Sequence, residues 1–430
     1  MPVYNVHSHV FTMNNAPEKF LHLYLPDLAA DLVDKITNTK AGASALSWIL
    51  SRPVFGAGGK RYASFLQIGK SKSQLEVFEK LKEQYPNQQM RFIALSMYME
   101  KCGAGNSLSG FEGQLEELIQ IKKQYYDRLH LFLGIDPRWK SNGKELKQTV
   151  EAYFEQQIDV GNGKKVAPFT GLKMYPSMGF YAFDENLVET FEWARENQVP
   201  VLSHCYYGGG IYNNDEDYLK NNINPYDPYA NAYYNQPTYI EQRKIGKWLT
   251  GTNTANNNRN TCSYFLEPHS YESLFKNFCQ GPNPLKFCLA HFGGSEMMRL
   301  QNGLKSPTAD EAALYGVLKV NWYQQVKNLM NAYPGVYADI AYTLADSGVH
   351  DIILNDLNDI GIGQRIMYGT DYFLAERDMP EKLIYENFKK STNGVQLTNY
   401  NQTLAWDQIA QNNIYTFLAS KYNPMSDIAN

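Results

Sequence analysis

Two histidines, His7 and His9, stand two residues apart near the start of the sequence, between the apolar residues Val6 and Val10. The apolar flanks predict a buried strand, and side chains two apart on a strand point to the same face. Both imidazoles would therefore project in one direction, which is how a backbone presents two nitrogen ligands to one metal ion. A His-x-His pair also arises by chance, so its meaning depends on whether further ligand-type residues follow.

Further residues of this type recur at the ends of later predicted strands. They are Lys173, His204, His291 and Asp371. Imidazole and carboxylate are ligands of zinc and similar divalent ions, and a catalytic site leaves one coordination position for water. Half of the 8 histidines fall at such strand ends, which independent chance does not easily produce. The pattern predicts a metal site, provided that the strand ends meet.

Each of these residues also has a structural alternative. Lys173 could extend its ammonium into solvent, and Asp371 could cap the helix that follows it. The other histidines are poorer candidates because they lie in helical stretches, at a strand start or at helix starts (His22, His130, His269 and His350).

The elements that must position these residues alternate along the chain. Strands are expected around His7 and His9 and at residues 91–99, 129–136, 169–175, 199–205, 286–292, 336–341 and 365–371, with helices at 74–84, 113–126, 144–158 and 185–196. Strands that alternate with helices indicate a parallel sheet. Eight such units favour a (β/α)8 TIM barrel, whose strand ends all meet at one mouth. The alternative, a doubly wound open sheet, usually shows a glycine-rich first turn, which is absent here.

We expect residues 1–430 to form one domain, because no Pro-rich or Gly/Ser linker divides the chain. A barrel core needs about 250 residues, and two insertions account for the excess. The larger, at about 206–267, is rich in Asn, Tyr and Gly, and the smaller lies near Leu300 to Asp310. Each follows a strand, which places it on the catalytic face of a barrel, where the larger one is expected to act as a lid.

Composition excludes several classes of function. A net charge of -4 and a pI near 6.1 argue against nucleic-acid binding, which needs a basic surface. No window approaches 18 uninterrupted apolar residues, and the N-terminus has no secretory signal pattern. The 5 cysteines lack any Cys-x-x-Cys spacing and are expected to be reduced thiols in a cytoplasmic protein. A small-molecule substrate is expected, and a homo-oligomer is compatible with the sequence.

The complete pattern resembles the amidohydrolase superfamily, in particular the amidohydrolase-related branch of metal-dependent hydrolases and decarboxylases. The matching motifs, in the family's order, are Asn5-Val-His-Ser-His9, Gly171-Leu-Lys-Met-Tyr-Pro176, Val199-Pro-Val-Leu-Ser-His204, Leu289-Ala-His-Phe-Gly-Gly294 and Tyr368-Gly-Thr-Asp371. The resemblance implies a metal held by His7, His9, His204 and Asp371. It implies that His291 is either a second ligand or a catalytic acid or base.

The resemblance leaves two roles open for Lys173, which is a carboxylated ligand that bridges two metals in some members and has no ligand counterpart in others. An ammonium beside a divalent cation is strongly disfavoured by like-charge repulsion. Lys173 must therefore be carbamylated, neutral or turned away from the ion. We expect one ion rather than two, and zinc as its identity.

The expected activity is metal-dependent hydrolysis, in which a metal-bound hydroxide attacks an amide, ester or lactone carbonyl. Asp371 would take the proton from water, His291 would stabilise the oxyanion or protonate the leaving group, and Arg138 would anchor a substrate carboxylate. A surface ion pair is the alternative for Arg138. The rival functions are a non-oxidative decarboxylase with the same ligands and a non-catalytic binding barrel.

Overall fold

The computed structural model describes residues 2–17, 67–86, 89–102, 105–141, 143–206, 265–306 and 320–425. Most of the lid-like insertion expected at about 206–267 therefore lies outside the described residues, as does the end of the smaller insertion near Leu300 to Asp310.

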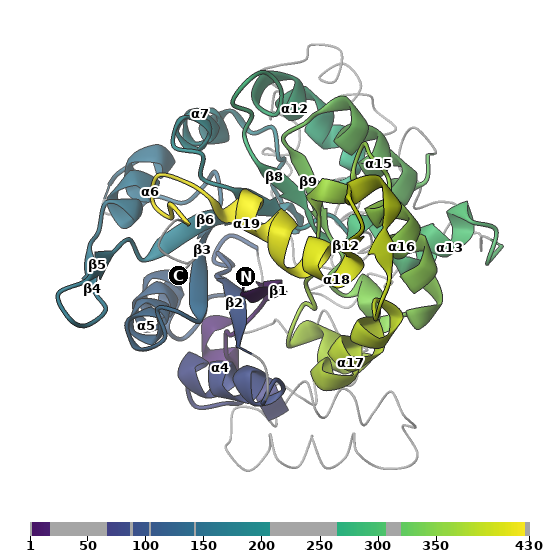
Figure 1. Ribbon diagram of the computed structural model, residues 1–430. Coiled ribbons are helices and arrows are strands. Elements are labelled where there is room, and N and C mark those ends of the chain that lie inside the picture. Colours follow the sequence, from purple (N-terminus) through teal and green to yellow (C-terminus); the bar gives the residue numbers. More distant parts are fainter. Residues whose placement is uncertain are drawn as a thin grey trace, which may run out of the picture.

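Eight parallel strands form one sheet at the centre of the molecule (Figure 1). In sheet order they are β1 (Val3–Ser8), β2 (Met90–Leu95), β3 (Leu129–Ile135), β6 (Phe169–Met174), β7 (Val201–Ser203), β8 (Phe287–Leu289), β9 (Val336–Asp339) and β10 (Ile366–Met367). Two small antiparallel hairpins lie apart from the sheet: β4 (Ile158–Asp159) with β5 (Lys165–Val166), and β11 (Gln396–Leu397) with β12 (Thr403–Leu404).

The sheet closes on itself between its first and last strands. The Val6 amide donates to the Tyr368 carbonyl at 3.0 Å, and the Asp371 amide donates to the His7 carbonyl at 2.9 Å. A parallel bridge between Ser8 and Tyr372 extends this seam. Eight parallel strands closed in this way, with helices between them, are a (β/α)8 TIM barrel, which confirms the fold class expected from the alternating pattern.

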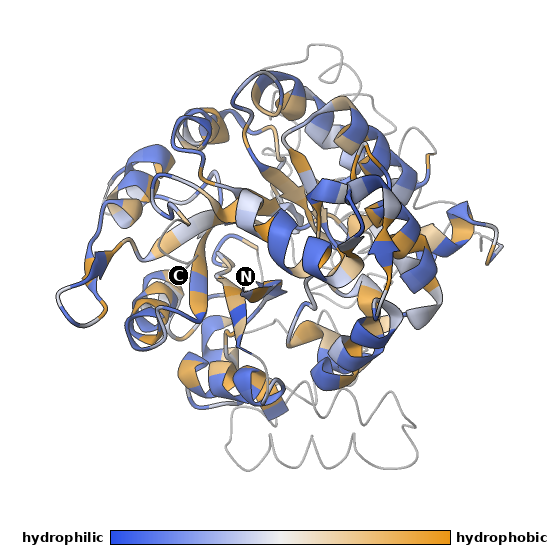
Figure 2. Cartoon of the chain, in the orientation of Figure 1, coloured by the Kyte–Doolittle hydropathy of each residue, from blue (hydrophilic) through white to orange (hydrophobic). Residues whose placement is uncertain are grey.

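Helices surround the barrel and face it with apolar residues. The strands that they cover are themselves largely hydrophobic, as their orange colour in Figure 2 shows. They are α4 (Gln74–Glu83), α5 (Gly110–Gln124), α6 (Leu146–Phe154), α7 (Val188–Glu196), α12 (Glu272–Phe278), α13 (Ser295–Gln301), α15 (Trp322–Ala332), α16 (His350–Leu357) and α17 (Glu381–Ser391). The sequence of α4 accounts for its position. The Ser73 side chain caps its amino end by accepting from the Glu76 amide, and its apolar residues Val77, Phe78 and Leu81 are buried. No helix in the described part of the chain is long and apolar enough to cross a membrane.

The strands are shorter than the sequence predicts at their carboxyl ends. The expected segment 199–205 contains only Val201–Ser203 as a strand, and His204 lies just beyond it. His291 and Asp371 also lie beyond their strands and have positive φ angles, of 68° and 65°. An extended strand cannot continue through such left-handed conformations. His204, His291 and Asp371 therefore stand on the loops that follow their strands, whereas His7 and Lys173 lie within β1 and β6.

The C-terminal segment covers the opposite end of the barrel. It comprises α18 (Ala405–Asp407), a π-helical stretch (Gln408–Asn412) and α19 (Asn413–Leu418), shown in yellow across the barrel in Figure 1. Phe417 of α19 packs against Phe132 and Tyr337, with ring centroids 6.3 and 5.0 Å apart. Because Tyr337 belongs to the start of β9, α19 seals the amino ends of the strands. The apolar pattern of the sequence does not indicate this covering of the amino ends by α19.

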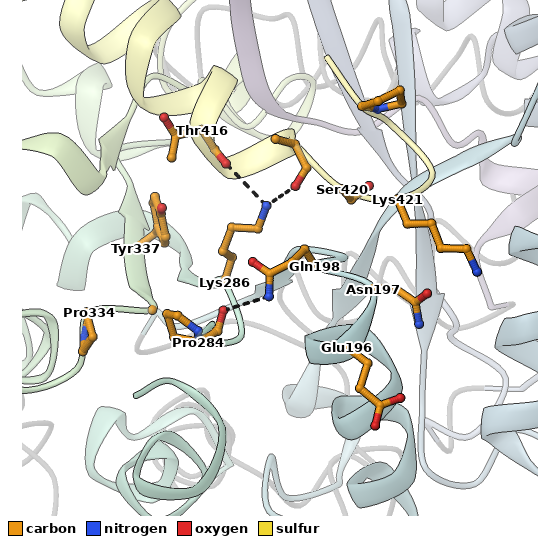
Figure 3. Close-up of a pocket in the computed structure, with 13 residues that line it drawn as sticks. Glu196, Asn197, Gln198, Pro284, Lys286, Pro334, Tyr337, Thr416, Ser420 and Lys421 are labelled. Carbon is orange, nitrogen blue, oxygen red and sulfur yellow. Dashed lines mark hydrogen bonds between the residues drawn. The ribbon is translucent and has the colours of Figure 1, made fainter. Parts of the chain in front are cut away.

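A hollow of about 590 Å³ lies beside α19 (Figure 3). Lys286, immediately before β8, reaches across it and donates to the carbonyl oxygens of Thr416, at 3.4 Å, and of Ala419. It thereby ties the end of α19 to the barrel. Burial lowers the pKa of the Lys286 amine to about 8.

The pH dependence of stability is expected to change when Lys286 is replaced by methionine. Between pH 8 and 10.5 the folded protein has released a proton that the unfolded chain keeps, so stability rises with pH. We expect this rise, on the order of 3 kcal/mol, to be missing in Lys286→Met when urea unfolding is compared from pH 7 to 10. Lys421→Met is the control, because this lysine lines the same hollow with its side chain 60% exposed. Parallel curves for the wild type and Lys286→Met would contradict the expectation.

Candidate metal centre

The barrel brings His7, His9 and Asp371 together at the carboxyl end of the sheet. The Nε2 atoms of His7 and His9 lie 3.4 and 3.3 Å from Oδ1 of Asp371. One potential ligand atom from each of the three residues lies within 4.8 Å of the others, and all three residues are buried. A group with these spacings can surround one ion.

The other ring nitrogen of each histidine is tied to the protein. Nδ1 of His7 lies 3.0 Å from Oδ2 of Asp339, and Nδ1 of His9 lies 3.3 Å from the carbonyl oxygen of Leu95. Both partners are acceptors, so we infer that each Nδ1 carries the proton. Each Nε2 then has a bare lone pair that faces Asp371, which is the usual arrangement of metal-binding histidines.

His204 and His291 form a second, linked pair. Nδ1 of His291 lies 3.0 Å from the Ala341 carbonyl oxygen, and its Nε2 lies 2.9 Å from Nδ1 of His204. If His291 donates to Ala341, its Nε2 must accept from His204, whose own Nε2 is left with a lone pair. That atom is buried and has no hydrogen-bond partner. Both nitrogens of His291 are thus engaged, and the structure places His291 where it orients His204.

A cation would satisfy buried polar atoms that have no hydrogen-bond partner in this region. Nε2 of His7, Nε2 of His204 and Oδ1 of Asp371 are all buried without a hydrogen-bond partner. Buried acceptors that face one another without a proton or cation between them are unfavourable. His7, His9 and Asp371 therefore fit a divalent ion. His204 does not belong to their group, and its role as a fourth ligand stays a prediction.

Electrostatics keep these groups in their ligand forms. Burial lowers the pKa of His7 to about 4 and also lowers the pKa values of His9 and His204. Burial alone would raise the pKa of Asp371, but the neighbouring His7 and His9 hold it below its usual value. At neutral pH the imidazoles are therefore neutral and the carboxylate is ionised, as metal binding requires.

Lys173 is buried on β6 rather than extended into solvent. Its side chain approaches the Tyr175 ring, with Nζ 5.8 Å from the centroid, and the buried Nζ has no hydrogen-bond partner. Burial lowers the pKa of the amine to about 8, against the opposing effect of Asp339 and Asp371. Of the alternatives drawn from the sequence, the solvent-exposed ammonium does not describe this side chain. Its role as a ligand stays a prediction.

Arg138 forms an ion pair, as its alternative supposed, but the pair is not at the surface because its partner Asp136 is buried. Its guanidinium binds both carboxylate oxygens of Asp136, at 2.8 and 2.5 Å, and also donates to the carbonyl oxygens of Met178 and Gly179. A role in anchoring a substrate carboxylate stays a prediction, and such a carboxylate would have to compete with Asp136.

Asp339, the last residue of β9, is the site residue that sequence reasoning missed. Besides binding His7, it accepts from the backbone amides of His291 and Ala341, each at 3.0 Å. Burial opposes its ionisation, but His7 and His291 hold its pKa well below the usual range. Asp339 also forms a second group with His7 and His291 in which one potential ligand atom from each lies within 4.8 Å of the others. A carboxylate at the end of the seventh strand meets the criterion that identified the other residues, so that criterion could have found it.

Replacing Asp339 with asparagine is expected to lower zinc affinity by roughly 10- to 100-fold, the usual effect of removing a partner of a ligand histidine. The neutral amide holds the proton on Nδ1 of His7 less strongly. Competition with a chromophoric chelator would measure the change. Asp356→Asn is the control, because Asp356 is 4% exposed and binds Tyr323 and Lys327 away from the site. Unchanged affinity in Asp339→Asn would show that this contact does not support the ligand.

Comparison with known proteins gives structural likeness only. No model of a known protein family matches the sequence, and no curated protein matches it. Similar solved structures include an amidohydrolase from Burkholderia multivorans with bound zinc, at 11% identity and a TM-score of 0.48 over 98% of this chain and 100% of that chain. IDCase from Metarhizium anisopliae has 13% identity and a TM-score of 0.46 over 97% of each chain.

A third similar structure is 5-carboxyvanillate decarboxylase from Sphingomonas paucimobilis, at 12% identity and a TM-score of 0.44 over 97% of this chain and 99% of that chain. Identities and TM-scores this low carry no argument about the reaction. The fold therefore rests on the strand topology, and the candidate site rests on its own geometry.

Proposed function

We propose that this protein is a metal-dependent hydrolase of the amidohydrolase type, which cleaves an amide, ester or lactone of a small molecule. The observation that carries the proposal is the convergence of bare imidazole nitrogens on the Asp371 carboxylate. Nε2 of His7 and of His9 lie 3.4 and 3.3 Å from that carboxylate, and Nδ1 of each ring is tied back. One zinc ion held by His7, His9, His204 and Asp371 is the occupant that fits this donor set best.

The ion would supply acidification of a water molecule and polarisation of the substrate carbonyl. Asp371 remains ionised and stands at the ligand cluster, where it can accept the proton that water loses on attacking a carbonyl. His291 holds Nδ1 of His204 at 2.9 Å. For His291 itself to donate a proton to a leaving group, this contact would have to open.

We further propose that residues 1–430 act as one domain with a lid at about 206–267, on a small-molecule substrate and in the cytoplasm. Three cysteines within the described ranges support a reducing compartment, because Cys205, Cys279 and Cys288 are buried free thiols.

Two measurements on the purified protein test the function. Metal analysis is expected to find about one zinc per chain, and a panel of amides, esters and lactones in ¹⁸O-labelled water is expected to give a labelled acid product. Chelation should abolish turnover, and added zinc should restore it. Release of CO₂ without incorporation of label would favour the decarboxylase instead. Absence of any stoichiometric divalent ion would favour a non-catalytic barrel.

A further inference from the structure

The seam that closes the barrel also separates the candidate ligands. His7 and His9 belong to β1 and the residue after it, whereas Asp371 follows β10. β10 contains only Ile366–Met367, and its ladder partner is β9. The backbone bonds across the seam are therefore few, and side chains must help to set how Asp371 stands relative to the two histidines.

Asn5 and Thr370 link the two sides of this seam. Oδ1 of Asn5 accepts from the backbone amides of His7 and Thr370, each at 3.2 Å. Nδ2 of Asn5 donates to the Thr370 hydroxyl at 2.7 Å. Asn5 lies two residues before His7, and Thr370 directly precedes Asp371. Any shift in this link would therefore be passed to ligand residues on both sides.

Glu381, the first residue of α17, holds this link from outside the barrel. Its Oε1 accepts from the Thr370 hydroxyl at 2.7 Å, from Nδ2 of Asn5 at 3.3 Å and from the Tyr85 hydroxyl. The Glu381 amide donates to Oε1 of Glu376 at 2.8 Å, which fixes the start of the helix. Glu381, Asn5 and Thr370 are all 0% exposed, so water cannot replace a lost partner without the structure opening.

Glu381 acts in this network as a hydrogen-bond acceptor, and its role does not depend on a negative charge. Burial raises the pKa of Glu381 to about 8, and its other oxygen, Oε2, has no hydrogen-bond partner. Three hydrogen bonds converge on Oε1, so the contact depends on an accepting oxygen at this position. The amide oxygen of glutamine has the same accepting capacity, whereas leucine has none.

We propose that Glu381 is a positioning residue, which holds Thr370 and Asn5 so that Asp371 faces His7 and His9 at metal-binding distance. The inference rests on the proposed metal centre and assigns to α17, an outer helix, control over the geometry of that centre. Supporting residues of this kind typically change metal affinity by about 10- to 100-fold when they are removed.

Zinc affinity, measured by competition with a chromophoric chelator on metal-free protein, tests the proposal. Glu381→Leu is expected to lower affinity by roughly 10- to 100-fold, and Glu381→Gln is expected to stay close to the wild type. Thr370→Val provides a second route, because it keeps the shape of the side chain and removes the hydroxyl between Asn5 and Glu381. The double variant Thr370→Val/Glu381→Leu should bind zinc with about the affinity of the more severely affected single variant, because both changes break one network.

Asp356→Leu on α16 is the matched control, since it also removes a buried acid and is expected to cost stability without lowering zinc affinity. Wild-type affinity in both Glu381→Leu and Thr370→Val would overturn the proposal and leave the metal centre intact. Additive losses in the double variant, or an equal loss in Asp356→Leu, would also overturn it. If the wild type bound no divalent ion, the proposed function and this inference would fail together.

Discussion

Replacing His9 with alanine is expected to weaken zinc binding by roughly 100- to 1000-fold. Structural zinc sites bind with about 10–16 kcal/mol, so one of four ligands contributes about 3 kcal/mol. His9 is 3% exposed, and its Nε2 lies 3.3 Å from Oδ1 of Asp371. Alanine therefore removes a nitrogen from the middle of the cluster and leaves an acceptor-rich cavity. The measurement is chelator competition on metal-free protein, accompanied by metal analysis of the protein as purified.

The matched control is His350→Ala. His350 is 2% exposed at the start of α16, where Nδ1 lies 2.8 Å from the Ser391 hydroxyl. This substitution also removes a buried, hydrogen-bonded imidazole, so it should lower the free energy of unfolding by a similar amount. Its zinc affinity should remain that of the wild type. If His9→Ala kept wild-type affinity, the candidate metal centre would have to be abandoned.

Replacing Asp371 with asparagine is expected to lower kcat by roughly 10²- to 10⁴-fold, the range that a positioned proton acceptor contributes. The neutral amide can still place an oxygen at the site, but it cannot take a proton from water at neutral pH. Zinc affinity should fall as well, so rates must be compared at zinc concentrations that saturate both proteins. The substrate for the measurement is whichever amide, ester or lactone of the panel the wild type hydrolyses.

Asp356→Asn separates this effect from a general loss of stability. It makes the same chemical change at a buried aspartate that binds Lys327 at 2.6 Å on the outer helix layer. Its kcat should match that of the wild type at temperatures where both are folded. Full activity in Asp371→Asn would remove the proposed proton transfer, even if the protein still bound zinc.

Much of this architecture could be predicted because its signals are local. The alternation of apolar strands with amphipathic helices placed each of the eight barrel strands within a few residues of its observed position. The His7–His9 spacing and the strand-end position of Asp371 then identified residues that the structure places within 4.8 Å of one another. A closed parallel barrel makes strand ends meet, so knowing the strands was nearly enough to find the site.

Other features depended on contacts between distant segments. The strand ends that carry His291 and Asp371 turn through positive φ angles, which the apolar pattern does not record. Asp339 was overlooked, although the same strand-end reasoning applied to it. The contacts of Lys286 with α19, and the hydrogen bonds that Asn5 and Tyr85 donate to Glu381, join segments more than a hundred residues apart. No periodicity signals such pairings.

The sequence by itself therefore determined the barrel and, apart from Asp339, the residues that could bind a metal. Residue type and periodicity depend on burial, which acts at each position separately. Only the tertiary structure decided which nitrogen of each histidine is available, because the acceptors for Nδ1 of His7 and His9 are Asp339 and Leu95, on other strands. Folding brings together the hydrogen-bond partners that fix the tautomer of each histidine. As a result, the paired histidines near the N-terminus both direct the lone pair of Nε2 toward the Asp371 carboxylate.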